Sequence, residues 1–181
     1  MINEYNYANE DEDINQIEDN IWLGNTFAAA NITDLKEKGI TKILSLMDGN
    51  SSNFSYKEQG FNQKIINIMD YDTENIIQYF GECINFIKGE EKVFVHCAAG
   101  ESRSATIVIA YLMWKKKMSF DKAYNLVKEK RSRIYPNFGF RQQLQMFEKL
   151  LYENGFNLSN IYFRSIKWKP SENRNNYFSF Y

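Results

Sequence analysis

The 181-residue sequence has few of the side chains that hold metals or form disulfides: one histidine and two cysteines. These are too few for a zinc site, so we expect neither a bound metal nor another cofactor. The low cysteine content also predicts a reducing compartment. We therefore expect a cytoplasmic protein, with the nucleus as an alternative.

Strong net charge and long apolar runs are absent as well. A formal net charge of −1 argues against a protein whose main task is to bind nucleic acid. No apolar run approaches the length of a membrane span, and the first residues lack the basic and apolar regions of a signal peptide. We expect a monomer that has no nucleic acid as a partner and no membrane span.

The length and the 44% hydrophobic content are typical of one folded domain with a sizeable core. Acidic residues dominate the chain before Lys36, which predicts a solvated acidic tail over residues 1–13, with a docking role as the alternative. The folded domain is expected over residues 14–153. Residues 154–181 form an aromatic extension that could pack on the domain, perform partner docking or cover a site; an added strand over residues 160–167 would suit the first of these.

Apolar strand patterns alternate with helical ones along the domain. Strands are expected over residues 21–23, 42–46, 64–68 and 92–95, and helices over residues 27–38, 73–87, 103–114, 120–130 and 138–151. This order predicts an α/β fold with a central, twisted, mostly parallel sheet of about four or five strands flanked by helices. The helix from residue 103 is apolar on all sides, so we expect it to be buried.

The most informative segment is residues 96–104, HCAAGESRS, which joins a short apolar strand to that helix. A helix N-terminus and the charge of Arg103 would favour the thiolate of Cys97, the form of cysteine that attacks, and the Ser104 hydroxyl could hydrogen-bond to it. The backbone amides expected to bind an anion are those of Ala98, Ala99, Gly100, Glu101, Ser102 and Arg103. The guanidinium fork of Arg103 suits the same anion. Alternatively, Cys97 is a buried strand-end cysteine and Arg103 only a helix-start cation.

The single histidine and the second cysteine have structural interpretations. His96 is expected to orient the loop through hydrogen bonds, with its side chain turned away from the anion. Cys83 falls on the apolar stripe of a predicted helix, which favours a core position. A disulfide between Cys83 and Cys97 under oxidation is the alternative.

Residues 96–104 match the HCxxGxxR signature of the cysteine-dependent protein tyrosine phosphatases. The Ser-Arg-Ser ending, followed by SATIVIAYLM, resembles the dual-specificity branch of that family. The segment IWLG at residues 21–24 is similar to the first strand of this branch, and YPNFGF at residues 135–140 is similar to its late turn. The resemblance covers about residues 15–153 and implies a phosphatase-like fold.

The resemblance also implies roles in a phosphocysteine mechanism. Cys97 would be the nucleophile, Arg103 would bind the phosphoryl oxygens, and Ser104 would assist departure of the thiolate. Such a route needs a general acid that later acts as a base, and an Asp can do both. Asp70 and Asp72 are the candidates, and the family spacing to the aromatic pair at residues 79–80 selects Asp70. Asn137 would brace the loop.

The expected activity is hydrolysis of phosphotyrosine, and of phosphoserine or phosphothreonine, in phosphorylated proteins. Lipid, RNA or small-molecule phosphates are alternative substrates, although the charge of Glu101 would repel a polyanionic head group. Binding of phosphoproteins without turnover is a third interpretation. Arg131 or Arg133, in a basic stretch, could contact a second phosphate.

Overall fold

The computed structural model describes residues 13–49 and 55–170. The predicted acidic tail lies outside these residues except for Asp13, and so does the end of the aromatic extension from residue 171 on. The described residues cover the predicted domain apart from residues 50–54, together with the first part of the extension.

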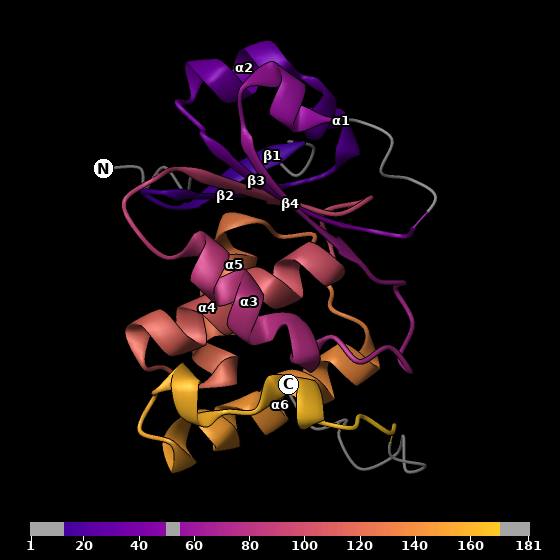
Figure 1. Ribbon diagram of the computed structural model, residues 1–181, viewed down its shortest axis with the longest axis vertical. Helices are drawn as coiled ribbons and strands as arrows, with labels where there is room; N and C mark the ends of the chain where they lie inside the picture. The colour runs from indigo at the N-terminus through magenta and orange to yellow at the C-terminus, as the bar shows by residue number, and fades with distance from the viewer. Residues whose placement is uncertain (1–12, 50–54, 171–181) are drawn as a thin grey trace, which may run out of the picture.

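A five-stranded sheet lies at the centre of the molecule (Figure 1). Its strands are β1 (Ile14–Glu18), β2 (Ile21–Gly24), β3 (Lys42–Met47), β4 (Asn62–Asn67) and β5 (Val93–His96). Their order across the sheet is β1-β2-β5-β3-β4, with β1 antiparallel to β2 and all other pairs parallel. The predicted fold class is confirmed. Strand β1 was not expected, because its sequence INQIE is short and mostly polar; it forms an edge strand paired only with β2.

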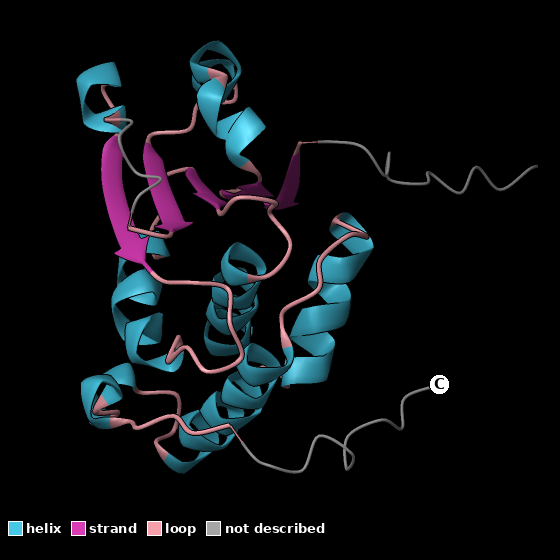
Figure 2. Ribbon diagram, turned by 90° about the vertical axis from the view of Figure 1, so that its right-hand side faces the viewer, coloured by secondary structure: helices cyan, strands magenta, loops and turns pink. Residues whose placement is uncertain are grey.

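Helices cover both faces of the sheet, as Figures 1 and 2 show. The short helices α1 (Thr26–Ala30) and α2 (Ile32–Glu37) lie on one face. The larger helices α3 (Phe80–Ile87), α4 (Arg103–Lys116), α5 (Phe120–Lys130) and α6 (Phe138–Glu153) lie on the other. Because strand side chains alternate between faces, β5 contributes Val93 and Val95 to the larger core and Phe94 to the smaller one.

Helix α4 is buried, as its apolar pattern predicts: 11 of its 14 residues are buried. It packs between the sheet and helices α3, α5 and α6. Burial on all sides leaves the axis of α4 little freedom, and this rigidity carries over to the loop at its N-terminus. In residues 13–49 and 55–170, no helix is long and apolar enough to cross a membrane.

Two expected elements differ in the structure. The helix expected from residue 73 begins at Phe80, after a 3-10 turn, η2 (Ile77–Tyr79). The side chain of Gln143 on α6 bonds to the Glu74 carbonyl at 2.8 Å and the Ile77 amide at 3.0 Å, so these backbone groups have partners outside a helix. The strand expected over residues 160–167 is not formed, since this segment contains the 3-10 turns η3 (Leu158–Asn160) and η4 (Phe163–Ser165).

Candidate active site

Cys97 lies at the carboxyl end of the central parallel strand β5, directly before the loop that leads into α4. Ligands bind at this edge in open α/β sheets. The side chain is buried, and its Sγ accepts a hydrogen bond from the Oγ of Ser104 at 3.1 Å. Sequence and structure thus agree in bringing the thiol and this hydroxyl together.

The carbonyl groups of residues 98–102 all point to donors in the surrounding protein. The carbonyl oxygens of residues 98–102 accept hydrogen bonds of 2.8–3.2 Å from Thr26, Arg131, Tyr135 and Thr106. A trans peptide places its N–H opposite its carbonyl group. The amides that follow these carbonyls therefore project to the inner side of the loop, where they form a nest of partial positive charge suited to an anion.

Arg131 supports this loop from behind. Its Nε donates to the Gly100 carbonyl at 2.9 Å, one Nη to the Ala99 carbonyl at 3.2 Å, and the other Nη to Oδ1 of Asn15 at 2.6 Å. Burial lowers the pKa of Arg131, and the nearby charge of Arg133 adds to this effect. Of the two arginines considered for contact with a second phosphate, Arg131 is excluded, because the residue is only 2% exposed. In the sequence Arg131 lies in a basic stretch, and no local pattern indicates that it supports the Cys97 loop.

Gly100 allows the loop its close turn. Its φ of +68° is a conformation that other residues rarely adopt, and a Cβ at this position would lie 2.5 Å from the backbone of Gly24 on β2. A glycine is therefore required here both by backbone conformation and by space.

Arg103, at the first turn of α4, is buried, with 8% of the residue exposed. Its Nη1 donates to the Ile68 carbonyl at 3.2 Å, just after the end of β4. Its Nε is buried and has no hydrogen-bond partner among the described residues. Since buried polar groups are almost always hydrogen-bonded, this N–H indicates a site for an acceptor from a ligand.

Asp70 is held beside the loop by two hydrogen bonds. Its Oδ1 accepts from the Ser102 hydroxyl at 2.6 Å and from Nδ2 of Asn137 at 2.8 Å. The backbone N–H of Asn137 donates in turn to the Ser102 hydroxyl at 3.1 Å, and its Oδ1 caps α6 by accepting from Phe140 at 2.9 Å. Asn137 thus joins three segments distant in sequence. Only the backbone amide of Ser102 was expected to take part in the site, so the contacts of its hydroxyl were not predicted.

Asp72, the alternative acid, points elsewhere. Its Oδ1 accepts from the Gly139 amide at 3.5 Å, at the N-terminus of α6. A carboxylate near a helix N-terminus is favoured by the dipole, so this contact suits a capping residue. The geometry separates the two candidates and leaves Asp70 with the contacts to the Cys97 loop.

His96 lies on the opposite face of the sheet from α4. Its ring stacks on Phe94 at 5.3 Å between centroids, and its Nε2 hydrogen-bonds with Oγ of Ser45 at 2.7 Å. Burial lowers the pKa of His96 to about 4, and the positive charge of Arg103 acts in the same direction. The imidazole is therefore neutral at physiological pH.

Cys83 differs from Cys97 in its surroundings. It is fully buried on α3, and burial raises the pKa of its thiol. A protonated thiol is a poor nucleophile, so Cys83 has the properties of a core residue. Both cysteines are free in the structure.

The exposed rim of the loop carries an ion pair. Glu101 accepts from Nε and one Nη of Arg133 at 2.9 and 2.8 Å. The two side chains are more than a third exposed, so the pair contributes little to stability. Arg133, unlike Arg131, lies where it could meet a substrate.

Comparison with known proteins identifies the family. The family model "Dual specificity phosphatase, catalytic domain" matches residues 21–150, which include Asp70, Cys97, Arg103 and Asn137. The chain belongs to the dual specificity phosphatase family. Human dual specificity protein phosphatase 9 is 43% identical over 140 residues, covering 75% of this chain and 36% of that protein. Dual specificity protein phosphatase 1B of Arabidopsis thaliana is 37% identical over 147 residues, covering 79% and 86%.

The solved structures agree with this assignment. A human tyrosine phosphatase-like serine/threonine/tyrosine-interacting protein shares 35% identity and a TM-score of 0.73, covering 77% of this chain and 97% of that one. The predicted family and fold class are confirmed by these matches, and the predicted enzyme class, a cysteine-dependent phosphatase, is the one that this family implies. The chain spans about a third of the length of human dual specificity protein phosphatase 9 but most of the length of the Arabidopsis thaliana protein.

Proposed function

We propose that the chain is a protein phosphatase that hydrolyses phosphotyrosine, phosphoserine and phosphothreonine through a phosphocysteine intermediate. The observation that carries this proposal is the combination at the Cys97 loop. A buried sulfur lies in a loop whose carbonyls face outward, next to an arginine whose buried Nε has no partner in the described part of the chain. A phosphate dianion would satisfy the inward amides and this N–H together.

In the first step the Cys97 thiolate attacks phosphorus. An S–P bond forms as the bond from phosphorus to the ester oxygen breaks, and the leaving oxygen takes a proton from Asp70. Arg103 and the amides of the loop hold the equatorial oxygens, on which negative charge is spread in the transition state. The products of this step are the free tyrosine, serine or threonine side chain and a phosphocysteine.

In the second step the Asp70 carboxylate takes a proton from water. The water oxygen bonds to phosphorus and the S–P bond breaks, which releases inorganic phosphate and returns the thiolate. The Ser104 hydroxyl, 3.1 Å from the sulfur, stabilises the departing thiolate by donating a hydrogen bond. Asp70 is then protonated and ready for the next cycle.

The site favours phosphoproteins over polyphosphorylated lipid head groups. Glu101 places a carboxylate on the rim, although its pairing with Arg133 reduces its repulsion of anions. Residues 96–104 contain no lysine that could bind the additional phosphates of such a head group. Binding without turnover is the second candidate, because one relative is named as a phosphatase-like interacting protein.

Hydrolysis of synthetic peptides tests this proposal. Wild type should release phosphate from phosphotyrosine and phosphothreonine peptides, and Cys97→Ser should bind them without turnover. Asp70→Asn should lower kcat/KM on the phosphotyrosine peptide by about 10²–10⁴. Binding without hydrolysis by wild type would favour the second candidate, and faster hydrolysis of an inositol phosphate than of either peptide would assign a different substrate class.

We further propose that the protein works as a monomer in the cytoplasm or nucleus. Its free cysteines, one of them the nucleophile, support a reducing compartment. Light scattering of purified protein tests the oligomeric state, and a tagged full-length protein in cells tests the compartment.

A further inference from the structure

The chain continues beyond the family match, which ends at residue 150, and returns to the loop that carries Asp70. We name residues 161–168 the C-terminal strap and residues 70–76 the acid loop. In Figure 1 the segment containing the strap runs past α3 and α6 at the end of the molecule distant from α1 and α2. The predicted aromatic extension thus packs on the domain over its described part, without forming a strand.

Apolar side chains anchor the strap. Ile161 and Phe163 are buried in the larger core, and the Phe163 ring lies 5.9 Å from that of Phe147 on α6. A Cβ at Gly81 would come within 2.6 Å of the Phe163 ring, so the glycine at the start of α3 makes room for this anchor. The strap is therefore a packed element.

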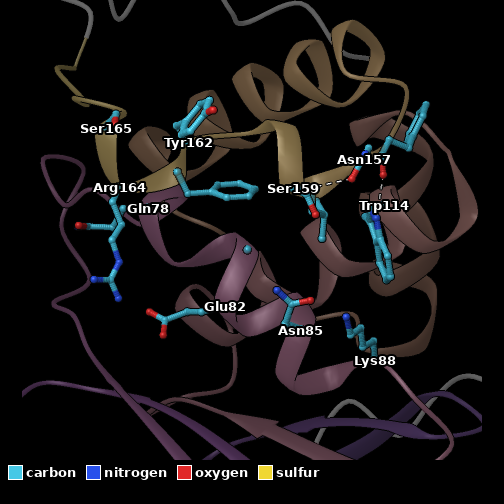
Figure 3. Close-up of a pocket in the computed structure, with 14 residues that line it drawn as sticks. Gln78, Glu82, Asn85, Lys88, Trp114, Asn157, Ser159, Tyr162, Arg164 and Ser165 are labelled. Atoms are coloured by element: carbon cyan, nitrogen blue, oxygen red, sulfur yellow. Dashed lines mark hydrogen bonds between the residues drawn. The ribbon is translucent and has the colours of Figure 1, made fainter.

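The outer side of the strap forms one wall of a surface pocket of about 580 Å³, shown in Figure 3. Tyr162 and Arg164 line it from the strap, and Gln78, Glu82 and Asn85 line it from η2 and α3. None of residues 96–104 lines this pocket. The strap also contacts the acid loop.

Two hydrogen bonds join the strap to the acid loop. Nε1 of Trp168 donates to the Asp72 carbonyl at 2.9 Å, and Nδ2 of Asn75 donates to the Ile166 carbonyl at 2.8 Å. The bond from Trp168 therefore ends only two residues from Asp70 along the chain. The acid loop is irregular backbone, so these side-chain bonds replace the ladder bonds that a strand would supply.

Helix α6 contacts the acid loop from a second direction. A Cβ at Gly139 would overlap the Asp72 carbonyl, and Gln143 holds the Glu74 carbonyl. The acid loop thus runs between the N-terminus of α6 and the strap. Removing the strap bonds would leave the loop attached on one side only and would widen the range of positions open to Asp70.

We propose that the C-terminal strap positions the general acid, with Trp168 as a positioning residue; this inference rests on the proposed function. A group that only positions the acid changes proton transfer to the leaving oxygen and leaves phosphate binding intact. Loss of the positioning group should therefore lower the rate most for a substrate whose leaving group needs the proton. Tyrosine, whose phenol has a pKa of about 10, is such a group, whereas the more acidic 4-nitrophenol departs readily without help.

The test compares Trp168→Phe with a matched control, Trp114→Phe. The control removes an indole bond of similar length, 3.1 Å to the Phe156 carbonyl, at the pocket in Figure 3 and away from the acid loop. With Trp168→Phe, kcat/KM on a phosphotyrosine peptide should fall about five-fold, equivalent to about 1 kcal/mol. On 4-nitrophenyl phosphate it should change less than about two-fold, and the control should change neither.

The outcomes separate this inference from the proposed function. Equal losses on both substrates, or no loss on the peptide, would overturn the positioning role while leaving the phosphatase intact. A wild type that hydrolyses neither substrate would overturn the proposed function itself. If Trp168→Phe melts below the assay temperature, Asn75→Ala removes the other strap bond and is judged by the same ratio of losses.

Discussion

The only histidine of the chain should make stability depend on pH. Its ordinary pKa is 6.5, and burial lowers the pKa of His96 to about 4 in the folded protein. Between these values the unfolded state binds the proton that the folded state excludes. The free energy of unfolding should therefore fall as pH falls below 6.5, and this contribution is lost completely below pH 4.

The size of the effect follows from the two pKa values. The full difference corresponds to about 3 kcal/mol, of which about 2 kcal/mol is lost by pH 5. This is a large fraction of the stability of a typical domain. The cause is local: the imidazole lies between Phe94 and Tyr56, with Ser45 as its hydrogen-bond partner, where a charge would be poorly solvated.

Urea unfolding at pH 5 to 8 measures this contribution. We would compare Cys97→Ser with the double variant Cys97→Ser/His96→Gln, so that the two proteins differ only at position 96. The carboxylates are common to both variants, so their effects cancel in the difference. Between pH 7.5 and 5, the variant that retains His96 should lose about 2 kcal/mol more than the double variant.

Parallel stability curves for the two proteins would refute this reasoning. They would mean that His96 titrates equally in the folded and unfolded states, and so that the imidazole is solvated in the folded protein. A steeper loss in the double variant would refute it as well. Either result would also remove the physical basis for a neutral imidazole beside Cys97.

Two further substitutions test the loop. Gly100→Ala should abolish detectable hydrolysis and lower the thermal midpoint more than Gly60→Ala, because both glycines have positive φ but only the first would clash, with Gly24; equal shifts in circular-dichroism melts would contradict this. Arg131→Lys should cost about 2 kcal/mol in urea unfolding and lower kcat/KM about ten-fold, because one ammonium cannot replace the fork that binds two loop carbonyls and Asn15; wild-type kinetics would show that the loop needs no such support.

The contiguous part of the site could be predicted from the sequence because its causes are local. Strand, cysteine, glycine and arginine follow one another within residues 93–104, and the apolar helix that follows is recognised by its composition. The turn at Gly100 depends on its own φ, and the contact between Cys97 and Ser104 joins residues only seven positions apart. Short-range constraints of this kind are present in the sequence itself.

The second half of the site could not be derived from local pattern. Asp70 was selected over Asp72 only by resemblance, and what separates them in space is the meeting of Asp70 with Ser102 and Asn137. These residues are 32 and 67 positions away along the chain. A short polar loop carries no periodicity that would predict such partners.

What the sequence by itself determined was the family, the layered fold and the Cys97 loop, since each rests on local pattern and adjacent residues. The tertiary structure decided the buried role of Arg131, the late start of α3, whose preceding backbone is bound by Gln143, and the path of the strap to Trp168. The physical reason is that a buried polar group must find a partner, and which partner it finds depends on how distant segments pack.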